Sequence, residues 1–374
     1  MKKVFRTVAM AALVIAASCG KDDAPSEMEQ QAQEQEELAE NLEKTPLEAN
    51  KVSDNVVIEG STKNEGNPPT PNQMISLDIS GTGKTAFLNE GFDIELSSDA
   101  TIAGAYIQFK ANDGTVSDSY YDVDLTTSSQ FGKYSISEKA FGLKSKKINS
   151  LVSKNEGDVT VDVDFNSNIE PGTFCYVVCV YDAEGNISAP SEVCATVESW
   201  GGNADLVAKW DIVKQEYRDG DETDIDIIGE EDCTYGSLTT DCSNGEINTF
   251  YNCSTYEFMT LELRADGTFS YRDKAEVKRY DEEASKAACE TVYQDMTFVD
   301  KYNSDGNWAY VQGESRLTLV ETSYSYSEND VIEEEDTYEL GEGELIFDGA
   351  VEISGDSFTL SEDGSDFFKV YLAK

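Results

Sequence analysis

Carboxylates are the most abundant side chains in this sequence that could do chemistry. Asp and Glu together number 74, and histidine is absent. Without imidazole, the chain cannot build a Ser-His-Asp or Cys-His nucleophile, and it lacks the usual zinc and copper ligands. Two adjacent carboxylates can hydrolyse a glycoside, but so many acids form chance pairs, and no phosphate-binding glycine loop or nucleophile elbow occurs. We therefore predict a non-enzymatic protein with no catalytic residue and no cofactor.

Calcium binding is a second chemistry that acidic side chains suggest. The run "RDGDETDIDIIGEED" contains Asp219, Asp221, Asp224 and Asp226, and calcium takes about six to eight oxygen ligands from flexible loops. The spacing lacks the glycine and the distal glutamate of the helix-loop-helix calcium site. A solvated acidic loop is therefore favoured over an ion site, both here and in "ENDVIEEED" near Glu333, and we predict no metal site.

The charge balance narrows the range of partners. The formal net charge is −46. Such a surface repels phosphate backbones and anionic lipid head groups, so nucleic acid is not expected as a partner. Cationic, neutral or metal-bridged partners are expected instead. A simpler interpretation of the acidity is solubility in a salty or crowded exterior.

The cysteines predict the disulfide framework of an exported chain. Once Cys19 is set aside, seven of the eight remain, so at least one thiol should be free or should pair outside the chain. A hairpin turn over Ala183–Asn186 places Cys175 opposite Cys194 in an antiparallel pair, where a disulfide is geometrically possible. Cys179 then falls opposite Pro190. We expect Cys179 to be the unpaired thiol, buried as a small apolar side chain.

The first residues have the pattern of an export signal. Three basic residues precede an apolar run over residues 8–17, which is too short to span a membrane. The stretch "AASC" that ends at Cys19 resembles the signal of bacterial lipoproteins, in which the cysteine carries diacylglycerol and becomes the mature N-terminus. The resemblance implies a signal peptide over residues 1–18 and lipidation at Cys19.

The three residues Lys21, Asp22 and Asp23 resemble the export signal of Bacteroidetes lipoproteins that reach the outer face of the outer membrane. Several acyl chains on one residue bind a membrane firmly, whereas a single chain binds marginally. The resemblance therefore implies an outer-membrane lipoprotein that faces the cell exterior and contacts the membrane through the acyl chains on Cys19.

Residues 19–71 read as an acidic tether, because they are rich in Glu, Gln, Asn and Pro and contain few large apolar residues. Such a segment cannot bury enough surface to offset the entropy lost on ordering. Within it, Glu27–Lys44 is rich in helix formers and could be a solvated helix that ends at Pro46.

Residues 72–200 alternate apolar and polar side chains in short runs such as "FDIELSS", "AYIQFKA" and "VTVDVDF", which are separated by Gly, Asn and Asp clusters. Alternation of this kind predicts an antiparallel β-sandwich. The pattern is similar to that of the immunoglobulin-like modules of surface lipoproteins, although the Cys…Trp…Cys signature of antibody domains is absent.

Residues 204–374 follow a short joint at Gly201–Asn203 and contain about eight short strands, which predicts a sheet that closes into an antiparallel β-barrel. The runs "LVAKW", "LELRADGTFSY" and "DGNWAYVQGESRLTLV" resemble the lipocalin-like domains of Bacteroidetes lipoproteins. Relatives in that family tie a cysteine before the Asp-Gly hairpin to one after it. The resemblance implies a Cys253–Cys289 disulfide, which leaves Cys233 with Cys242, although four cysteines allow three pairings.

The barrel interior offers the candidate ligand-binding residues. An eight-stranded barrel holds either packed side chains or one small ligand, and alternation does not separate these two cases. Tyr324 and Tyr326 share one face of "TSYSYSE" and could stack on sugar rings, but the barrel wall is the favoured interpretation. The residues expected to line the interior are Trp210, Leu261, Leu263, Phe269, Tyr271 and Trp308.

These features predict a surface-anchored lipoprotein with an acidic tether, an immunoglobulin-like β-sandwich and a terminal lipocalin-like β-barrel. We expect non-enzymatic binding of a small apolar molecule in the barrel, or of a glycan or peptide at its open rim. The alternative is an interaction subunit whose barrel is solid and whose surface docks to a partner lipoprotein or outer-membrane complex.

Overall fold

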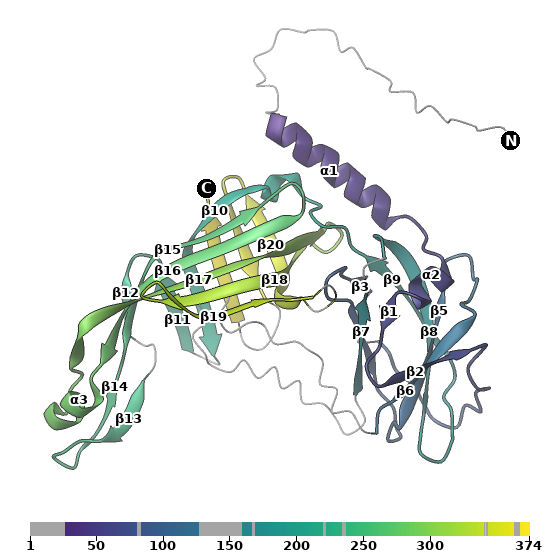
Figure 1. Cartoon of the computed structure of the whole chain (residues 1–374), viewed down its shortest axis with the longest axis horizontal. Coiled ribbons are helices and arrows are strands. Elements are labelled where there is room, and N and C mark those ends of the chain that lie inside the picture. Colours follow the sequence, from purple (N-terminus) through teal and green to yellow (C-terminus); the bar gives the residue numbers. More distant parts are fainter. Residues whose placement is uncertain are drawn as a thin grey trace, which may run out of the picture.

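The computed structural model shows an all-β protein in which two β-domains lie beside each other, with a long helix above their junction (Figure 1). The all-β prediction is confirmed. The signal peptide 1–18, Cys19 and the export residues Lys21, Asp22 and Asp23 lie outside the described residues. The structure describes residues 27–80, 84–126, 159–166, 169–219, 222–233, 237–339, 341, 343–362 and 367–374.

The first domain is a sandwich of two sheets. One sheet has the strand order β2-β6-β5-β8-β9-β3 and the other has the order β1-β7-β4. The short strand β3 runs parallel to β9, and the remaining pairs are antiparallel. Pairing of β4 with β7 in one sheet and of β5 with β8 in the other is the arrangement of an immunoglobulin-like sandwich. The bounds are β1 Val56–Val57, β2 Ser61–Glu65, β3 Thr85–Ala86, β4 Phe92–Leu96, β5 Gly104–Lys110, β6 Ser119–Asp124, β7 Val159–Phe165, β8 Gly172–Tyr181 and β9 Ser191–Val197.

The sandwich begins earlier in the chain than the sequence suggests. The predicted helix is present as α1 (Glu27–Glu43) and ends before Pro46, but residues 45–66 fold with the sandwich instead of forming a tether. In this segment, α2 (Ala49–Ser53) packs on the domain, and the core takes up Leu47, Val52, Val56 and Ile58. The few apolar side chains are spaced to complete a core that the rest of the domain supplies, so composition alone is misleading.

The second domain is a closed barrel of eight antiparallel strands, as predicted. Successive strands of the barrel are neighbours, and β10 closes it by pairing with both β15 and β22. The turn between β15 and β16 requires a glycine, because Gly267 has φ +77° and an added Cβ would lie 2.3 Å from Trp200. The barrel strands are β10 Ala208–Asp219, β15 Cys253–Leu263, β16 Thr268–Tyr280, β17 Tyr293–Val311, β18 Arg316–Glu328, β20 Glu344–Ser354, β21 Ser357–Ser361 and β22 Phe367–Ala373.

Extensions of the barrel strands carry smaller elements. Strands β11 (Glu222–Ile227), β12 (Glu231–Asp232) and β19 (Val331–Thr337) pair with β10, β15 and β18, respectively. A separate lobe contains the hairpin β13–β14 and helix α3, and it projects away from both domains (Figure 1). None of the helices in the described ranges is long and apolar enough to cross a membrane. The lobe elements are β13 Leu238–Asp241, β14 Ile247–Phe250 and α3 Glu282–Ala288.

The two domains are packed against each other. The joint adds to the barrel wall, because the Gly201 amide donates to the Trp308 carbonyl at 2.7 Å and the Tyr310 amide donates to the Gly201 carbonyl at 2.8 Å. Phe87 of the sandwich stacks on Trp200 with ring centroids 6.3 Å apart. A small apolar cluster at this junction contains Phe87, Ala309, Val320 and Leu345, with Trp200 packed against it.

Candidate functional site

The six residues predicted to line the barrel lie together in its core. Each is buried, and all belong to one apolar cluster to which every barrel strand contributes. Their side chains contact one another and their neighbours across the interior, which is the packed arrangement that a barrel of eight strands allows. Ligand contact by these residues stays a prediction. They are Trp210, Leu261, Leu263, Phe269, Tyr271 and Trp308.

The two tryptophans hold fixed positions in this core. The Trp210 indole N–H donates to the Leu206 carbonyl at 2.8 Å, and the Trp308 indole N–H donates to the Arg264 carbonyl at 3.0 Å. The ring of Trp210 meets Phe358 edge-on, with centroids 4.7 Å apart. Buried indoles need such acceptors, so these tryptophans act as anchored packing residues at the end of the barrel beside the β15–β16 turn.

A layer of tyrosines and carboxyl groups crosses the barrel interior beyond the tryptophans. The Tyr271 hydroxyl donates to Asp273 Oδ2 at 2.9 Å, and the Tyr302 amide donates to Asp273 Oδ1 at 3.1 Å. The Tyr302 hydroxyl donates to Glu321 Oε2 at 2.7 Å. Asp273 is 7% exposed and Glu321 is fully buried. Burial raises the pKa of Asp273 to about 7, so this carboxyl group keeps its proton in mildly acidic solution.

The sequence interpretation missed Asp273 and Glu321. Asp273 follows Tyr271 at an inward position of β16, and its side chain lies beside that ring. One feature of the sequence could have indicated them: a carboxyl residue lies opposite an inward tyrosine of the next strand, as Asp273 lies opposite Tyr302. A carboxyl group at such a position implies a buried hydrogen-bond partner, since an unpaired buried charge is very costly.

The tyrosines continue as a stack toward the barrel edge. Tyr302 stacks on Tyr324 with centroids 5.9 Å apart, and Tyr338 lies 6.2 Å beyond Tyr324. The Tyr324 hydroxyl donates to Glu334 Oε1 at 2.6 Å, and the Tyr338 hydroxyl donates to Glu344 Oε2 at 2.7 Å. The hydrogen bond to Glu334 raises the pKa of Tyr324. Tyrosine stacks that are tied to acids in this way rigidify the barrel wall.

The predicted role of "TSYSYSE" as barrel wall is confirmed. Tyr324 and Tyr326 pack against the barrel core. The Ser325 hydroxyl accepts a hydrogen bond from the side-chain amide of Asn303 at 3.2 Å. Ser323 and Ser325 both line an open groove across β17, β18 and β19. The tyrosine rings therefore support the strand from one side, and the serines contribute to a polar surface.

This surface, which we call the outer groove, has a volume of about 520 Å³. Arg272 binds both carboxylate oxygens of Asp305 at 2.7 and 2.8 Å, which fixes one wall. Hydroxyl, amide and carboxylate groups predominate, so the groove can hydrogen-bond to sugar hydroxyls or to basic groups, but it offers little to an apolar molecule. The lining residues are Asn303, Asp305, Ser323, Tyr324, Ser325, Glu335, Asp336 and Thr337.

The sandwich cysteines behave as predicted. Cys175 and Cys194 lie opposite each other in the β8–β9 ladder and form a disulfide. Cys179 is the free thiol, and it is buried. Desolvation raises the pKa of Cys179 to about 11, so the group stays protonated and unreactive at neutral pH.

The pairing implied for the barrel cysteines is wrong: the disulfides are Cys233–Cys253 and Cys242–Cys289, not Cys253–Cys289 and Cys233–Cys242. Strand β12 causes the first pairing, since Asp232 lies opposite Ser254 and places the following cysteine beside Cys253. The lobe causes the second. There the Ser243 amide donates to the carbonyl of Lys286 at 2.9 Å, which brings the β13–β14 hairpin to the end of α3.

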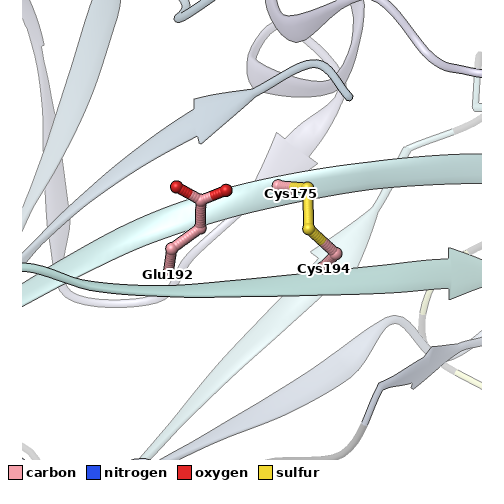
Figure 2. A group of neighbouring side chains, drawn as sticks. All are labelled: Cys175, Glu192 and Cys194. Atoms are coloured by element: carbon pink, nitrogen blue, oxygen red, sulfur yellow. A yellow bond between two sulfur atoms is a disulfide. The ribbon is translucent and has the colours of Figure 1, made fainter. Parts of the chain in front are cut away.

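Neither group of neighbouring acid and cysteine side chains in the described part of the chain is a metal site. Figure 2 shows Glu192 beside Cys175 and Cys194, whose sulfur atoms are bonded to each other and so cannot act as thiolate ligands. Glu192 instead pairs with Lys110 at 2.7 Å. In the second group, Glu231 lies beside the Cys233–Cys253 disulfide.

The acidic run considered for calcium is largely a strand and not the expected loop. Asp224 and Asp226 belong to β11 and lie opposite Tyr217 and Gln215 of β10. Asp221 and the side chain of Asp219 lie outside the described residues. Asp224 and Asp226 are two residues apart, so they project from the same face of this strand. An extended strand does not wrap its side chains around one ion as a flexible calcium loop does.

No protein-family model matches the chain, and no curated protein matches it. The functional assignment therefore depends on the packed barrel, the outer groove and the strand extensions described above.

Proposed function

We propose that this chain is a non-enzymatic binding protein, anchored by lipid at the cell surface, which recognises a glycan or a peptide through the outside of its barrel. The observation that carries this proposal is the contrast between interior and exterior. The interior is occupied by a continuous apolar cluster from all eight strands, whereas the outer groove of about 520 Å³ is open and polar. A small apolar ligand inside the barrel is therefore disfavoured.

The proposed anchor is Cys19. The stretch "AASC" and the following Lys21, Asp22 and Asp23 support lipidation and export to the outer face of the outer membrane. Their resemblance to the signals of Bacteroidetes lipoproteins supports that placement. Radiolabelled palmitate should label the wild-type protein and not a Cys19→Ala variant, and protease added to intact cells should remove the protein. Protection from the protease would contradict surface display.

The chemistry of the groove supports a polar ligand. Its wall combines serine and threonine hydroxyls with Asn303 and with carboxylates, which are the groups that bind sugar hydroxyls and amines. Native mass spectrometry of protein purified from its host should detect bound mass. A Ser325→Trp substitution should remove that mass by filling the groove, whereas Ser354→Trp on an exposed hairpin should not. Bound mass that persists in Ser325→Trp would place the ligand elsewhere.

A second candidate is an interaction subunit of an outer-membrane complex. Exposed apolar side chains on the strand extensions favour it, because about half of the surface of each is open to solvent. Ile225 and Ile227 on β11, together with Val331 and Ile332 on β19, are between 46% and 59% exposed. Affinity purification under mild detergent, followed by size analysis, should recover a larger assembly if this candidate is correct.

A further inference from the structure

Strand β19 lies at the edge of its sheet in the described part of the chain. Its seven residues, Val331–Thr337, are all exposed, and β18 is its sole strand partner within the described ranges. Pairing runs from Ser323 opposite Thr337 to Glu328 opposite Val331. An edge strand presents a row of amide and carbonyl groups that can pair with a further strand. Figure 1 shows β19 at the margin of the barrel wall.

The side chains of this edge select a basic partner. Four consecutive acids, Glu333 to Asp336, follow the apolar pair Val331 and Ile332, and β19 contains no basic residue. Lys301 pairs with Asp330 in the turn before the strand, and Glu334 accepts a hydrogen bond from the Tyr324 hydroxyl. Opposite charges on paired strands stabilise the pair, whereas like charges facing each other destabilise it.

A second copy of this chain fits the edge poorly. Pairing of β19 with another β19 would place acids against acids, in a chain whose net charge is already −46. The acidic edge therefore disfavours self-association and leaves it open to a strand of opposite charge. This reasoning identifies a different protein, with an extended segment rich in lysine or arginine, as the occupant.

The outer groove lies on the same strand. Glu335, Asp336 and Thr337 of β19 form part of its wall, together with Ser323 and Ser325 of β18. A strand added beside β19 directs alternate side chains to the same face as this wall. Those side chains would meet the hydroxyl and carboxylate groups of the groove, while Val331 and Ile332, 59% and 58% exposed, offer apolar contact at the start of β19.

We propose that β19 is a docking strand, to which an extended lysine- or arginine-rich segment of a partner protein adds as the next strand of the sheet. This inference rests on the proposed function and names the partner class of the same surface. When a strand adds to a sheet edge, main-chain hydrogen bonds provide affinity for any extended segment, and side-chain contacts select among segments.

The test uses the full chain and two synthetic peptides of ten residues in which lysine alternates with threonine. The first peptide has a normal backbone. The second carries N-methyl groups on alternate residues, which keeps the charge but removes the amide donors of one edge. Calorimetry at low salt should show the first peptide binding at least about tenfold more tightly, because several ladder hydrogen bonds are lost in the second. Hydrogen exchange of the β19 amides should slow when the first peptide binds.

Charge reversal provides the matched variants. Glu333→Lys combined with Glu335→Lys should weaken binding of the first peptide by about tenfold or more. Glu352→Lys combined with Asp356→Lys makes the same change in net charge on the β20–β21 hairpin, where both residues are exposed, and should change binding by less than about threefold. Circular dichroism of both double variants checks that the barrel is intact.

Three results would overturn the docking strand. Equal binding of the two peptides would show that charge alone attracts them, without strand addition. Slow exchange, in the free protein, of the β19 amides that point away from β18 would show that the edge is already covered. Failure of both peptides to bind, while bound mass still disappears in Ser325→Trp, would refute the docking strand and leave the proposed function standing. Absence of any bound mass on the wild-type protein purified from its host would instead refute the proposed function.

Discussion

The sandwich and the barrel bury their side chains in different ways. The sandwich core is apolar and aromatic, with Phe92, Phe165, Phe174 and Tyr176 in contact. The barrel core adds buried carboxyl groups that accept tyrosine hydrogen bonds. Two sheets can approach until their side chains meet, whereas eight strands fix the radius of a barrel. Large tyrosines fill that fixed width, and their hydroxyls then require buried acceptors.

The largest expected effect tests whether the barrel is packed throughout. Trp308→Ala should lower the free energy of unfolding by about 5 kcal/mol, because it empties a fully buried site of the largest side chain. Urea titration followed by circular dichroism measures this loss. Phe174→Ala is the corresponding change in the sandwich core and should cost about 4 kcal/mol. A loss below about 1 kcal/mol for Trp308→Ala would indicate a loosely filled interior and revive the small-ligand hypothesis.

The next effect separates the polar barrel core from the apolar sandwich core. Folding raises the pKa of Asp273 from 3.8 to about 7. The unfolded chain therefore releases this proton at lower pH than the folded chain, so stability falls as the pH rises from about 4 to about 7. Asp273→Asn lacks this loss. Its stability relative to wild type should increase by up to about 4 kcal/mol across that range, since each pKa unit is worth about 1.4 kcal/mol.

Chemical denaturation at several pH values measures this difference. Glu276→Gln, an exposed change on the same strand β16, is the matched control and should leave the pH profile as in wild type. A stability difference between Asp273→Asn and wild type that does not change with pH would show that Asp273 has an ordinary pKa. It would also show that water reaches this part of the barrel core.

The third effect concerns the lobe, which has no counterpart on the sandwich. Replacing Cys242 and Cys289 by serine should destabilise the lobe by about 3 kcal/mol, because the disulfide closes a chain segment of 47 residues. Hydrogen exchange should speed up in β13, β14 and α3 and stay slow in the barrel. A non-reducing peptide map should join Cys242 to Cys289. A Cys253–Cys289 peptide would contradict this connectivity.

The smallest effect probes the tightness of the sandwich core. Cys179 is 4% exposed, and burial raises its pKa to about 11. Iodoacetamide at pH 8 should therefore leave the native mature protein, in which Cys19 is acylated, unmodified and add one group after denaturation, which intact mass measures. Cys179→Ala should cost about 1 kcal/mol. Rapid labelling of the native protein would mean that the sandwich opens more readily than the barrel.

Local alternation explains what the sequence could predict. Strand periodicity is a property of neighbouring residues, so it predicts both domains, the buried positions of Trp210 and Phe269, and the register that joins Cys175 to Cys194. The hydrogen bonds that hold the tyrosine layer are set by side chains on different strands. Asp273 therefore reads as an interruption of the apolar pattern, although the structure shows it paired with Tyr271.

Long-range pairing explains what the sequence could not predict. Val56 and Val57 form a strand only because Phe165, more than a hundred residues later, lies opposite, so their segment reads as part of a tether. The barrel disulfides depend on β12 pairing with β15 and on the fold of the lobe. The outer groove requires β19 to lie beside β18. None of these contacts leaves a periodic signal in the residues that make it.

Helix α1 ends on the seam between the two domains. Its Glu43 carboxylate accepts from the Ser199 amide at 2.9 Å, and Glu36 accepts from the Ala204 amide at 3.0 Å. These two contacts hold the helix against the joint, so a pull applied upstream of the helix meets them before it reaches a strand of either domain.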